Sequence, residues 1–419
     1  MPRLLLLLPT ATYRTAAFVE AARRLGVELT VASERPSTFQ AANPTGLMTL
    51  DLAHPERAAE QAREFARVYP LAGVVGVDDD TAVVAAAIAG ALGVRGNPVA
   101  ATEAARDKYE QRELLSAARV PVPRFALHRV NEDPRGIAGR VPYPCVVKPL
   151  RLSASRGVMR ADTPAQFVAA FGRLRRILAE PDVAACGEPA RRILVEEFVP
   201  GAEIALEGLM VDGGLRVLAL FDKPDPLDGP YFEETIYVTP SRLPSDAQRA
   251  LAICAERAAL ALGLVQGPVH AELRYNERGA WLIELAARPI GGRCTGALRF
   301  GTGDSGLGDG ASLEEIILRH ALGLPIASLE REVCASGVMM IPVPRPGVLR
   351  QVEGVEAARA VPLVDVVDIT AHPGETLVPW PEGSRYPGFI FARGPTAEGV
   401  EQALRAAHAR LRFVFDSTD

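Results

Sequence analysis

The first hundred residues alternate short apolar runs with longer amphipathic segments. Each apolar run has the length of a strand, and each amphipathic segment repeats its apolar positions at helical spacing. Regular alternation of strands and helices predicts a parallel, doubly wound sheet. The expected strands are 4–8, 28–32 and 73–77, the expected helices are 16–25, 56–68 and 81–92, and 93–96 closes the unit.

The pattern changes after residue 100. A helical stretch at 100–118 runs into Val120-Pro-Val-Pro123, a rigid connector that breaks the helix. The remainder after Pro325 is typical of a small α+β domain. We expect domains at 1–104, 105–202, 203–325 and 326–419. Strands are expected at 146–148, 192–196, 203–211, 215–222, 337–341, 364–371 and 388–393, and helices at 164–178, 245–262, 312–322 and 397–411.

Composition narrows the class of protein. A chain of 419 residues exceeds one ordinary core, so its length predicts two to four domains. Its 48% hydrophobic and 23% charged residues are typical of a soluble globular protein. The net charge of −5 is interleaved along the chain, which argues against nucleic acid or an anionic membrane as partner. The apolar run at 4–8 is too short to span a membrane, and the five cysteines lack paired spacing, so we expect a cytoplasmic protein.

Two glutamates stand at the ends of a strand–turn–strand pattern. Glu272 belongs to the first strand and Glu284 to the second, with Asn276-Glu-Arg-Gly279 as the turn. In a hairpin these carboxylates lie on facing strands near each other, and buried like charges that close require a cation between them. Hard divalent ions prefer carboxylate oxygens. The pair therefore predicts a magnesium site, whereas two solvated acids on an edge hairpin are the alternative.

A strand that ends in Lys148 is followed by a loop of small residues, Ser153-Ala-Ser-Arg-Gly157. An ammonium at a strand end together with loop N–H groups suits a nucleotide phosphate. The loop is not a Walker motif, and each signal alone is weak. Lys108, on the predicted helix, is by itself more typical of a surface charge.

Three further groups are candidates. The segment Glu196-Glu197-Phe198-Val199 precedes Pro-Gly and has the form of a hinge whose backbone groups could bind an adenine edge. Glu203, just after it, could accept hydrogen bonds from ribose hydroxyls. Exposed acids at a strand end are the simpler interpretation of both. Arg288 could stabilise a transferring phosphoryl group or simply pair with a glutamate. His270 lies one pleat from Glu272. The acids at 78–80 follow the third strand, where a solvated helix N-terminus is favoured over a ligand site.

Taken in order, these residues resemble the ATP-grasp superfamily of carboxylate–amine ligases over residues 1–325. The resemblance implies an α/β and α+β architecture: an N-terminal parallel-sheet domain, a two-lobed ATP-grasp domain and a C-terminal α+β extension. It implies ATP and Mg²⁺, with Mn²⁺ as an alternative. The implied roles are phosphate binding for Lys108 and Lys148, a mobile loop for Ser153, Ser155 and Gly157, the adenine hinge for Glu196, Glu197, Phe198 and Val199, the ribose acid for Glu203, magnesium ligands for Glu272 and Glu284, and catalysis for Arg288, Glu284 and His270.

One departure concerns the metal. The family often has Glu-x-Asn after the second hairpin strand, whereas this chain has Glu284-Leu-Ala286, so Glu284 would have to bridge two ions. The Ala-Ala-Arg form and the segments 221–224, 228–230 and 232–241 are most similar to the L-amino acid ligase branch.

That branch implies small-molecule carboxylate and amine substrates joined through an acyl phosphate, and it is compatible with a homodimer. Substrate contacts are expected from 78–81, 233–237, His270 and 291–293. The glycine-rich segment 301–310 is expected to act as a lid. The competing hypotheses are a carboxylase or purine-pathway enzyme that phosphorylates bicarbonate or formate, and an ATP-binding protein without turnover.

Overall fold

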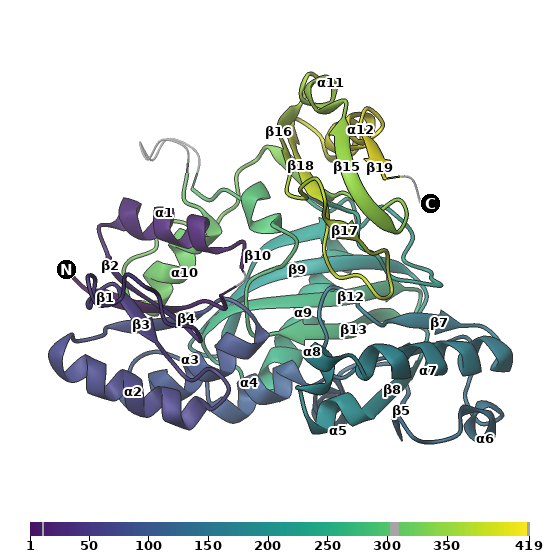
Figure 1. The fold of residues 1–419 in the computed structure, drawn as a ribbon, viewed down its shortest axis with the longest axis horizontal. Coiled ribbons are helices and arrows are strands. Elements are labelled where there is room, and N and C mark those ends of the chain that lie inside the picture. Colours follow the sequence, from purple (N-terminus) through teal and green to yellow (C-terminus); the bar gives the residue numbers. More distant parts are fainter. Residues whose placement is uncertain (11, 302–309, 417–419) are drawn as a thin grey trace.

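The N-terminal part contains a parallel sheet, as predicted, and the sheet has four strands. The computed structural model describes residues 1–10, 12–301 and 310–416 (Figure 1). The strand order is β3-β2-β1-β4, and all pairings are parallel. The strands are β1 (Arg3–Leu7), β2 (Glu28–Ser33), β3 (Leu47–Thr49) and β4 (Gly73–Gly76), and the helices are α1 (Thr15–Leu25), α2 (Pro55–Val68), α3 (Asp79–Leu92) and α4 (Val99–Arg106).

The apolar run of β1 is explained by burial on both faces of this sheet. Leu4 and Leu6 pack with Phe18 of α1 on one face, whereas Leu5 and Leu7 pack against α2 and α3 on the other. A strand buried on both faces has no polar face, so the alternation of polarity disappears. The short β3 was not predicted. The segment 93–96 forms no strand: Gly93 ends α3 in a left-handed conformation, and the residues up to 96 follow without regular structure.

A second sheet of four strands, in the order β5-β8-β6-β7, forms a small lobe at the lower right of Figure 1. Helix α7 covers it with Phe167, Phe171 and Leu174, which are fully buried at helical spacing. The elements of this part are α5 (Lys108–Ala117), β5 (Phe125–Arg129), α6 (Pro134–Ala138), β6 (Cys145–Lys148), β7 (Met159–Ala161), α7 (Pro164–Leu178), α8 (Pro181–Ala184), η1 (Glu188–Arg191) and β8 (Arg192–Glu197).

The largest sheet has eight strands in the order β13-β12-β9-β10-β11-β14-β18-β16. Within β12, alternation places Ala271 and Leu273 in the core with Leu251 of α9, and therefore turns Glu272 to the opposite face. The elements are β9 (Ala202–Val211), β10 (Gly214–Asp222), β11 (Ile236–Thr239), α9 (Ser245–Ala261), β12 (Gly267–Asn276), β13 (Gly279–Ala286), η2 (Cys294–Ala297), α10 (Leu313–Ala321), β14 (Ala335–Met340), β16 (Val364–Ile369) and β18 (Gly388–Gly394).

The C-terminal part lies above this sheet in Figure 1 and continues it through β14, β18 and β16. A further sheet in the order β17-β15-β19 packs beside it. The large sheet thus contains strands from both sides of the boundary expected between residues 325 and 326. The predicted domain boundaries stay predictions. The remaining elements are β15 (Gly347–Glu353), α11 (Val355–Arg359), β17 (Thr376–Leu377), α12 (Ala397–His408) and β19 (Arg412–Phe415).

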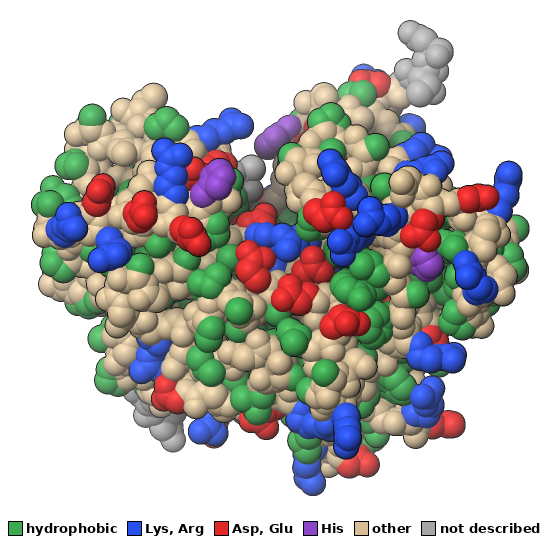
Figure 2. Space-filling model, turned by 90° about the horizontal axis from the view of Figure 1, so that it is seen from below, with side chains coloured by type: hydrophobic (Ala, Val, Ile, Leu, Met, Phe, Trp, Pro, Cys, Tyr) green, Lys and Arg blue, Asp and Glu red, His purple; other side chains and the backbone are tan. Residues whose placement is uncertain are grey.

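Within the described part of the chain, every helix is too short or too polar to cross a membrane. Figure 2 shows the molecule hollowed between the N-terminal part, on the left in both views, and the rest, with Lys, Arg, Asp and Glu side chains close to the hollow.

Candidate active site

A cavity of about 840 Å³ is shared by the N-terminal part, the small lobe, the large sheet and the C-terminal part. Of the predicted site residues, Gly157 alone does not line it. Those that do are Lys108, Lys148, Ser153, Ser155, Glu196, Glu197, Phe198, Val199, Glu203, His270, Glu272, Glu284 and Arg288. From the expected substrate contacts, Asp78, Asp79, Glu234, Tyr237, Gly291, Gly292 and Arg293 also line it. The expected lid falls largely on residues 302–309, which lie outside the described residues.

Lys108 is buried because the predicted helix breaks in front of it. Asp107 is extended and caps α5 by accepting the N–H groups of Tyr109 and Glu110, so Lys108 is the first residue of the new helix. Its Nζ donates to the carbonyl of Leu152 at 3.0 Å and lies 2.9 Å from Glu284 Oε1. Lys108 is therefore a buried cation of the cavity wall rather than a surface charge.

Glu196 carries the charge of a buried triad. Its carboxylate lies 2.6 Å from Arg112 Nε and 2.5 Å from Lys148 Nζ, and all three side chains are almost fully buried. Burial acts to raise the pKa of Glu196, but the two cations outweigh it and leave that pKa below its ordinary value. Burial lowers the pKa of Lys148, with Glu196 acting against the shift and the charge of Arg112 adding to it. The side chain of Glu196 is thus committed to cations, and adenine binding by the hinge backbone stays a prediction.

The rest of the predicted hinge is held by Arg274. This arginine donates to the carbonyl of Val199 at 2.9 Å and to Glu203 Oε2 at 2.8 Å, and its guanidinium lies 4.8 Å from the ring centre of Phe198. Glu197, in contrast, points outward to the exposed Arg124. Phe198 and Val199 therefore form an apolar wall of the cavity at a fixed position.

The loop of small residues is clamped from the C-terminal part. Ala154 and Ser155 adopt left-handed backbone conformations. The indole Nε1 of Trp380 donates to the carbonyl of Ala154 at 2.7 Å, and the N–H of Gly157 donates to the carbonyl of Pro381 at 2.9 Å. Trp380 was not singled out from the sequence, because its partner lies more than two hundred residues away.

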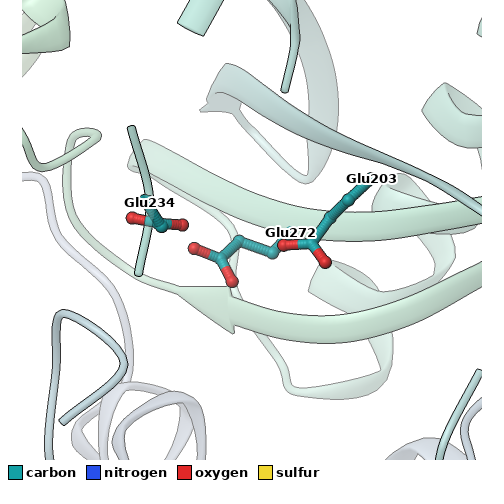
Figure 3. Close-up of side chains that lie close together, drawn as sticks. All are labelled: Glu203, Glu234 and Glu272. Atoms are coloured by element: carbon teal, nitrogen blue, oxygen red, sulfur yellow. The ribbon is translucent and has the colours of Figure 1, made fainter. Parts of the chain in front are cut away.

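Three carboxylates converge beside the large sheet. Oxygen atoms of Glu203, Glu234 and Glu272 all lie within 4.8 Å of one another, and Figure 3 shows the side chains pointing together. Lys223 Nζ lies between them, at 3.0 Å, 2.6 Å and 3.5 Å from the three carboxylates respectively. Sequence reasoning placed Glu234 only in the substrate pocket and missed Lys223, although both fall in segments that carried the resemblance.

The charges of this cluster are strongly shifted. Burial raises the pKa of Glu234 to about 7, with the Lys223 ammonium opposing the shift. Burial also acts to raise the pKa of Glu272, but Lys223 and His270 outweigh it and hold that pKa well below its ordinary value. Burial acts to lower the pKa of Lys223, yet Glu234, Glu272 and Glu203 raise it well above its ordinary value. The cluster therefore combines three carboxylates with a lysine that neutralises part of their charge.

Glu272 and Glu284 lie near each other on facing strands, as predicted, and a register shift between Glu272 and Leu273 makes them direct partners across β12 and β13. In the structure each lies beside a cation: Glu284 beside Lys108, and Glu272 beside Lys223, which also pairs with Glu203 and Glu234. Ala286, where the family often has asparagine, is buried and lines the cavity without offering a ligand. Carboxylate oxygens suit Mg²⁺, so the donor set fits this ion, and the assignment to these two residues stays a prediction.

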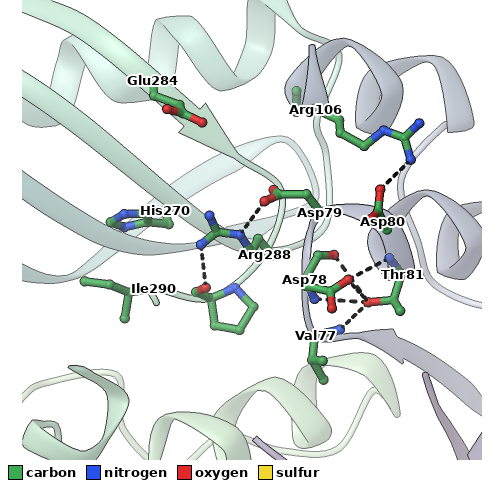
Figure 4. Close-up of polar contacts among 12 residues, drawn as sticks. Val77, Asp78, Asp79, Asp80, Thr81, Arg106, His270, Glu284, Arg288 and Ile290 are labelled. Atoms are coloured by element: carbon green, nitrogen blue, oxygen red, sulfur yellow. Dashed lines mark hydrogen bonds and ion pairs between the residues drawn. The ribbon is translucent and has the colours of Figure 1, made fainter. Parts of the chain in front are cut away.

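Arg288 is held by the N-terminal part. Its Nε donates to Asp79 Oδ2 at 3.0 Å, and its Nη1 donates to the carbonyl of Pro289 (Figure 4). Burial acts to lower the pKa of Arg288, but Asp79 outweighs it and raises that pKa. The acids at 78–80 were interpreted as a solvated helix N-terminus; Asp78 does cap α3 through Thr81, but Asp79 faces the cavity.

His270 is buried between two acids. Its Nδ1 lies 3.8 Å from Glu207 Oε2 and its Nε2 lies 3.7 Å from Glu272 Oε1. Burial lowers the pKa of His270, so the neutral ring prevails at neutral pH. A neutral imidazole that lines the cavity can accept a proton.

Three family models match the chain: an ATP-grasp N-terminal domain over residues 19–95, an ATP-grasp domain over residues 141–297, and L-amino acid ligase C-terminal domain 2 over residues 339–416. The chain belongs to the ATP-grasp superfamily. The predicted superfamily and fold class are confirmed, and the last of the three models supports similarity to the L-amino acid ligase branch.

Individual ATP-grasp proteins resemble the chain to different extents. The solved L-amino acid ligase of Bacillus licheniformis is 25% identical, with a TM-score of 0.77 over 100% of this chain and 99% of that one. An alanine–anticapsin ligase of Bacillus subtilis is 30% identical over 57% of this chain and 53% of its own length, so the chain spans about half of that relative. An ATP complex of carboxyaminoimidazole ribonucleotide synthase from Aspergillus clavatus, 18% identical with a TM-score of 0.71 over 98% of this chain and 99% of that one, shows the shared fold alone.

Proposed function

We propose that this ATP-grasp chain is an ADP-forming ligase that joins a carboxylate to an amine, both from amino acids or similar small molecules. The observation that carries the proposal is the convergence of Lys108, Lys148, Glu272, Glu284 and Arg288 on one cavity. A purine-type or carboxylase-type ligase is favoured less, because the C-terminal part that closes this cavity matches an L-amino acid ligase domain.

ATP is proposed to bind between the small lobe and the large sheet. Lys108 and Lys148 would face its phosphates, with N–H groups of the clamped loop around Ser155, while Phe198 and Val199 would contact the base. Glu272 and Glu284 would hold Mg²⁺, with Glu203 and Glu234 close by. The ion would supply neutralisation of phosphate charge and polarisation of the transferring phosphoryl group.

The reaction would use two transfers. In the first, a carboxylate oxygen attacks the γ-phosphorus, the bond to ADP breaks, and an acyl phosphate forms. In the second, the amine attacks the acyl carbon, phosphate leaves, and the amide forms with loss of one amine proton. Arg288 would orient the acyl phosphate and stabilise the oxyanion, and His270 is positioned to take up the proton.

The direct test is a matrix of amino acids. Purified protein is supplied with ATP, Mg²⁺ and pairs of amino acids, phosphate release is followed, and condensed products are detected by mass. Amide products that form only with ATP support the proposal. ATP turnover that is independent of any amine would favour the non-ligase alternatives instead.

Replacing Trp380 by phenylalanine is expected to weaken ATP binding by about 2- to 10-fold, because one hydrogen bond to the loop is lost while the aromatic packing on Tyr386 is kept. Calorimetric titration with ATP analogues measures the effect. The chain has two tryptophans, so Trp281→Phe, at a position that does not line the cavity, is the matched control. Equal ATP affinities in both variants would contradict the clamp.

Replacing Glu284 by glutamine is expected to raise the Mg²⁺ concentration for half-maximal phosphate release by at least about 10-fold, since a ligand oxygen and its charge are lost. A Mg²⁺ titration of turnover at fixed ATP measures this shift. Glu277→Gln, in the exposed turn of the same hairpin, should leave the titration unchanged. An unshifted titration in the Glu284 variant would remove this residue from the metal site.

A further inference from the structure

Arg14 is a buried cation that faces the cavity from the N-terminal part. It precedes α1, is 8% exposed and lines the cavity. Its Nη2 donates to the carbonyls of Pro289 at 3.1 Å and Ile290 at 2.8 Å. These bonds fix the guanidinium, but neutral carbonyls do not cancel its charge.

Arg14 differs from the other cations that line the cavity. Each of the six others pairs with a carboxylate; for example, Lys108 pairs with Glu284, and Arg385 pairs with Glu375 at 3.1 Å. Among the described residues, no carboxylate lies within ion-pair distance of Arg14. Its guanidinium carbon lies 5.3 Å from the ring centre of Tyr13, but a buried cation without an opposite charge is costly. This position therefore suits a ligand that brings a negative group.

The buried acid Glu207 lies close to this position but forms no ion pair with Arg14. Glu207 is fully buried and accepts the N–H of Ile290 at 3.0 Å, on the same residue whose carbonyl Arg14 contacts. Burial raises the pKa of Glu207 well above its ordinary value, while the N–H of Ile290 and the charge of Arg14 act to lower it. The hydrogen-bond partner of its carboxyl is thus the backbone and not Arg14.

The location of Arg14 relative to Arg288 indicates which negative group it would bind. Arg14 Nη2 and Arg288 Nη1 each lie 3.1 Å from the same carbonyl oxygen of Pro289, so the two guanidinium groups are neighbours. In an α-amino acid the amine is two bonds from the carboxylate carbon. A carboxylate bound at Arg14 would therefore bring its amine next to an acyl group held at Arg288.

We propose that Arg14 binds the carboxylate of the amine substrate, which makes it a specificity residue for free amino acids over simple amines. This inference rests on the proposed ligase function, because it assigns the second substrate of that reaction. The bidentate geometry of guanidinium and carboxylate suits this contact.

The test compares free amino acids with their uncharged amides as acceptors. The amine substrate of an active pair from the matrix is supplied either as the free amino acid or as its amide, for example L-alanine or L-alaninamide. The value of kcat/KM for each form is measured with wild type, Arg14→Gln and Arg14→Lys. Wild type should prefer the free acid by at least about 10-fold in kcat/KM. Arg14→Gln should lose about 10- to 100-fold with the acid and less than about 3-fold with the amide, while KM for ATP is unchanged.

Arg24→Gln on the exposed face of α1 is the matched control and should behave as wild type. Arg14→Lys keeps the charge and should retain part of the preference. Equal losses of activity with acid and amide would assign Arg14 to the acyl phosphate and overturn the proposal. A wild-type protein that shows no preference for the acid would overturn it too, and this measurement does not depend on a folded variant. A matrix without any amide product would instead count against the ligase function itself.

Discussion

Replacing Arg288 by methionine is expected to lower kcat for amide formation by about 10²- to 10³-fold, the usual cost of removing one donor to a developing oxyanion. Arg288 lines the cavity, and Asp79 fixes its orientation from the N-terminal part (Figure 4). Methionine keeps an unbranched stem but has no charge or donor. The effect should fall on kcat rather than on ADP affinity, because the proposed phosphate contacts are made by Lys108 and Lys148. Steady-state kinetics with the best substrate pair and calorimetric binding of ADP measure the two quantities.

Asp79→Asn provides the matched comparison for Arg288. It keeps the size of the partner and removes the charge, so it should lower kcat by about 10-fold, less than the loss of the arginine itself. Arg278→Met, on the exposed turn of the hairpin, should have no effect. An Arg288→Met protein with more than about a tenth of the wild-type kcat would show that the arginine does not stabilise the transition state.

The parts of the site that the sequence predicted are those set by local pattern. The alternation in β12 turns Glu272 to the cavity face, and the turn pairs β12 with β13, but a register shift beyond Leu273 sets Glu284 rather than Ile283 opposite Glu272. Lys148 ends an apolar strand, and the strand alone delivers it to the cavity. Where one element determines a side chain's position, periodicity was sufficient.

The parts that the sequence could not predict depend on contacts between distant segments. Lys223 and Glu234 join Glu272 only when β10, β11 and β12 assemble in one sheet, and Trp380 reaches the loop at Ala154 from the C-terminal part. The ion pair between Asp79 and Arg288 is similar, since it crosses 209 positions of the chain. No local pattern encodes such pairings. For this reason the local pattern favoured a solvated helix N-terminus at Asp79, whereas in the structure Asp79 lines the cavity.

The side chain of Glu196 has a role that its place in the predicted hinge did not indicate. Adenine binding was predicted for the backbone of this segment and stays a prediction, whereas the Glu196 carboxylate neutralises Arg112 and Lys148 within the protein. A lysine that faces a phosphate must remain charged and in place before the nucleotide arrives. A buried carboxylate behind it supplies both conditions, which gives Glu196 a structural role that its position in a hinge motif concealed.

Replacing Glu196 by glutamine is therefore expected to destabilise the protein by about 3–5 kcal/mol, because two buried cations lose their carboxylate. The neighbouring Glu197→Gln removes only an exposed ion pair with Arg124 and should cost at most about 1 kcal/mol. Urea unfolding followed by circular dichroism compares the two variants, with each transition fitted separately because a chain of several units need not unfold in one step. Similar unfolding curves for both variants would mean that water or Lys148 deprotonation relieves the buried charge. The triad would then not hold Lys148 in place for a phosphate.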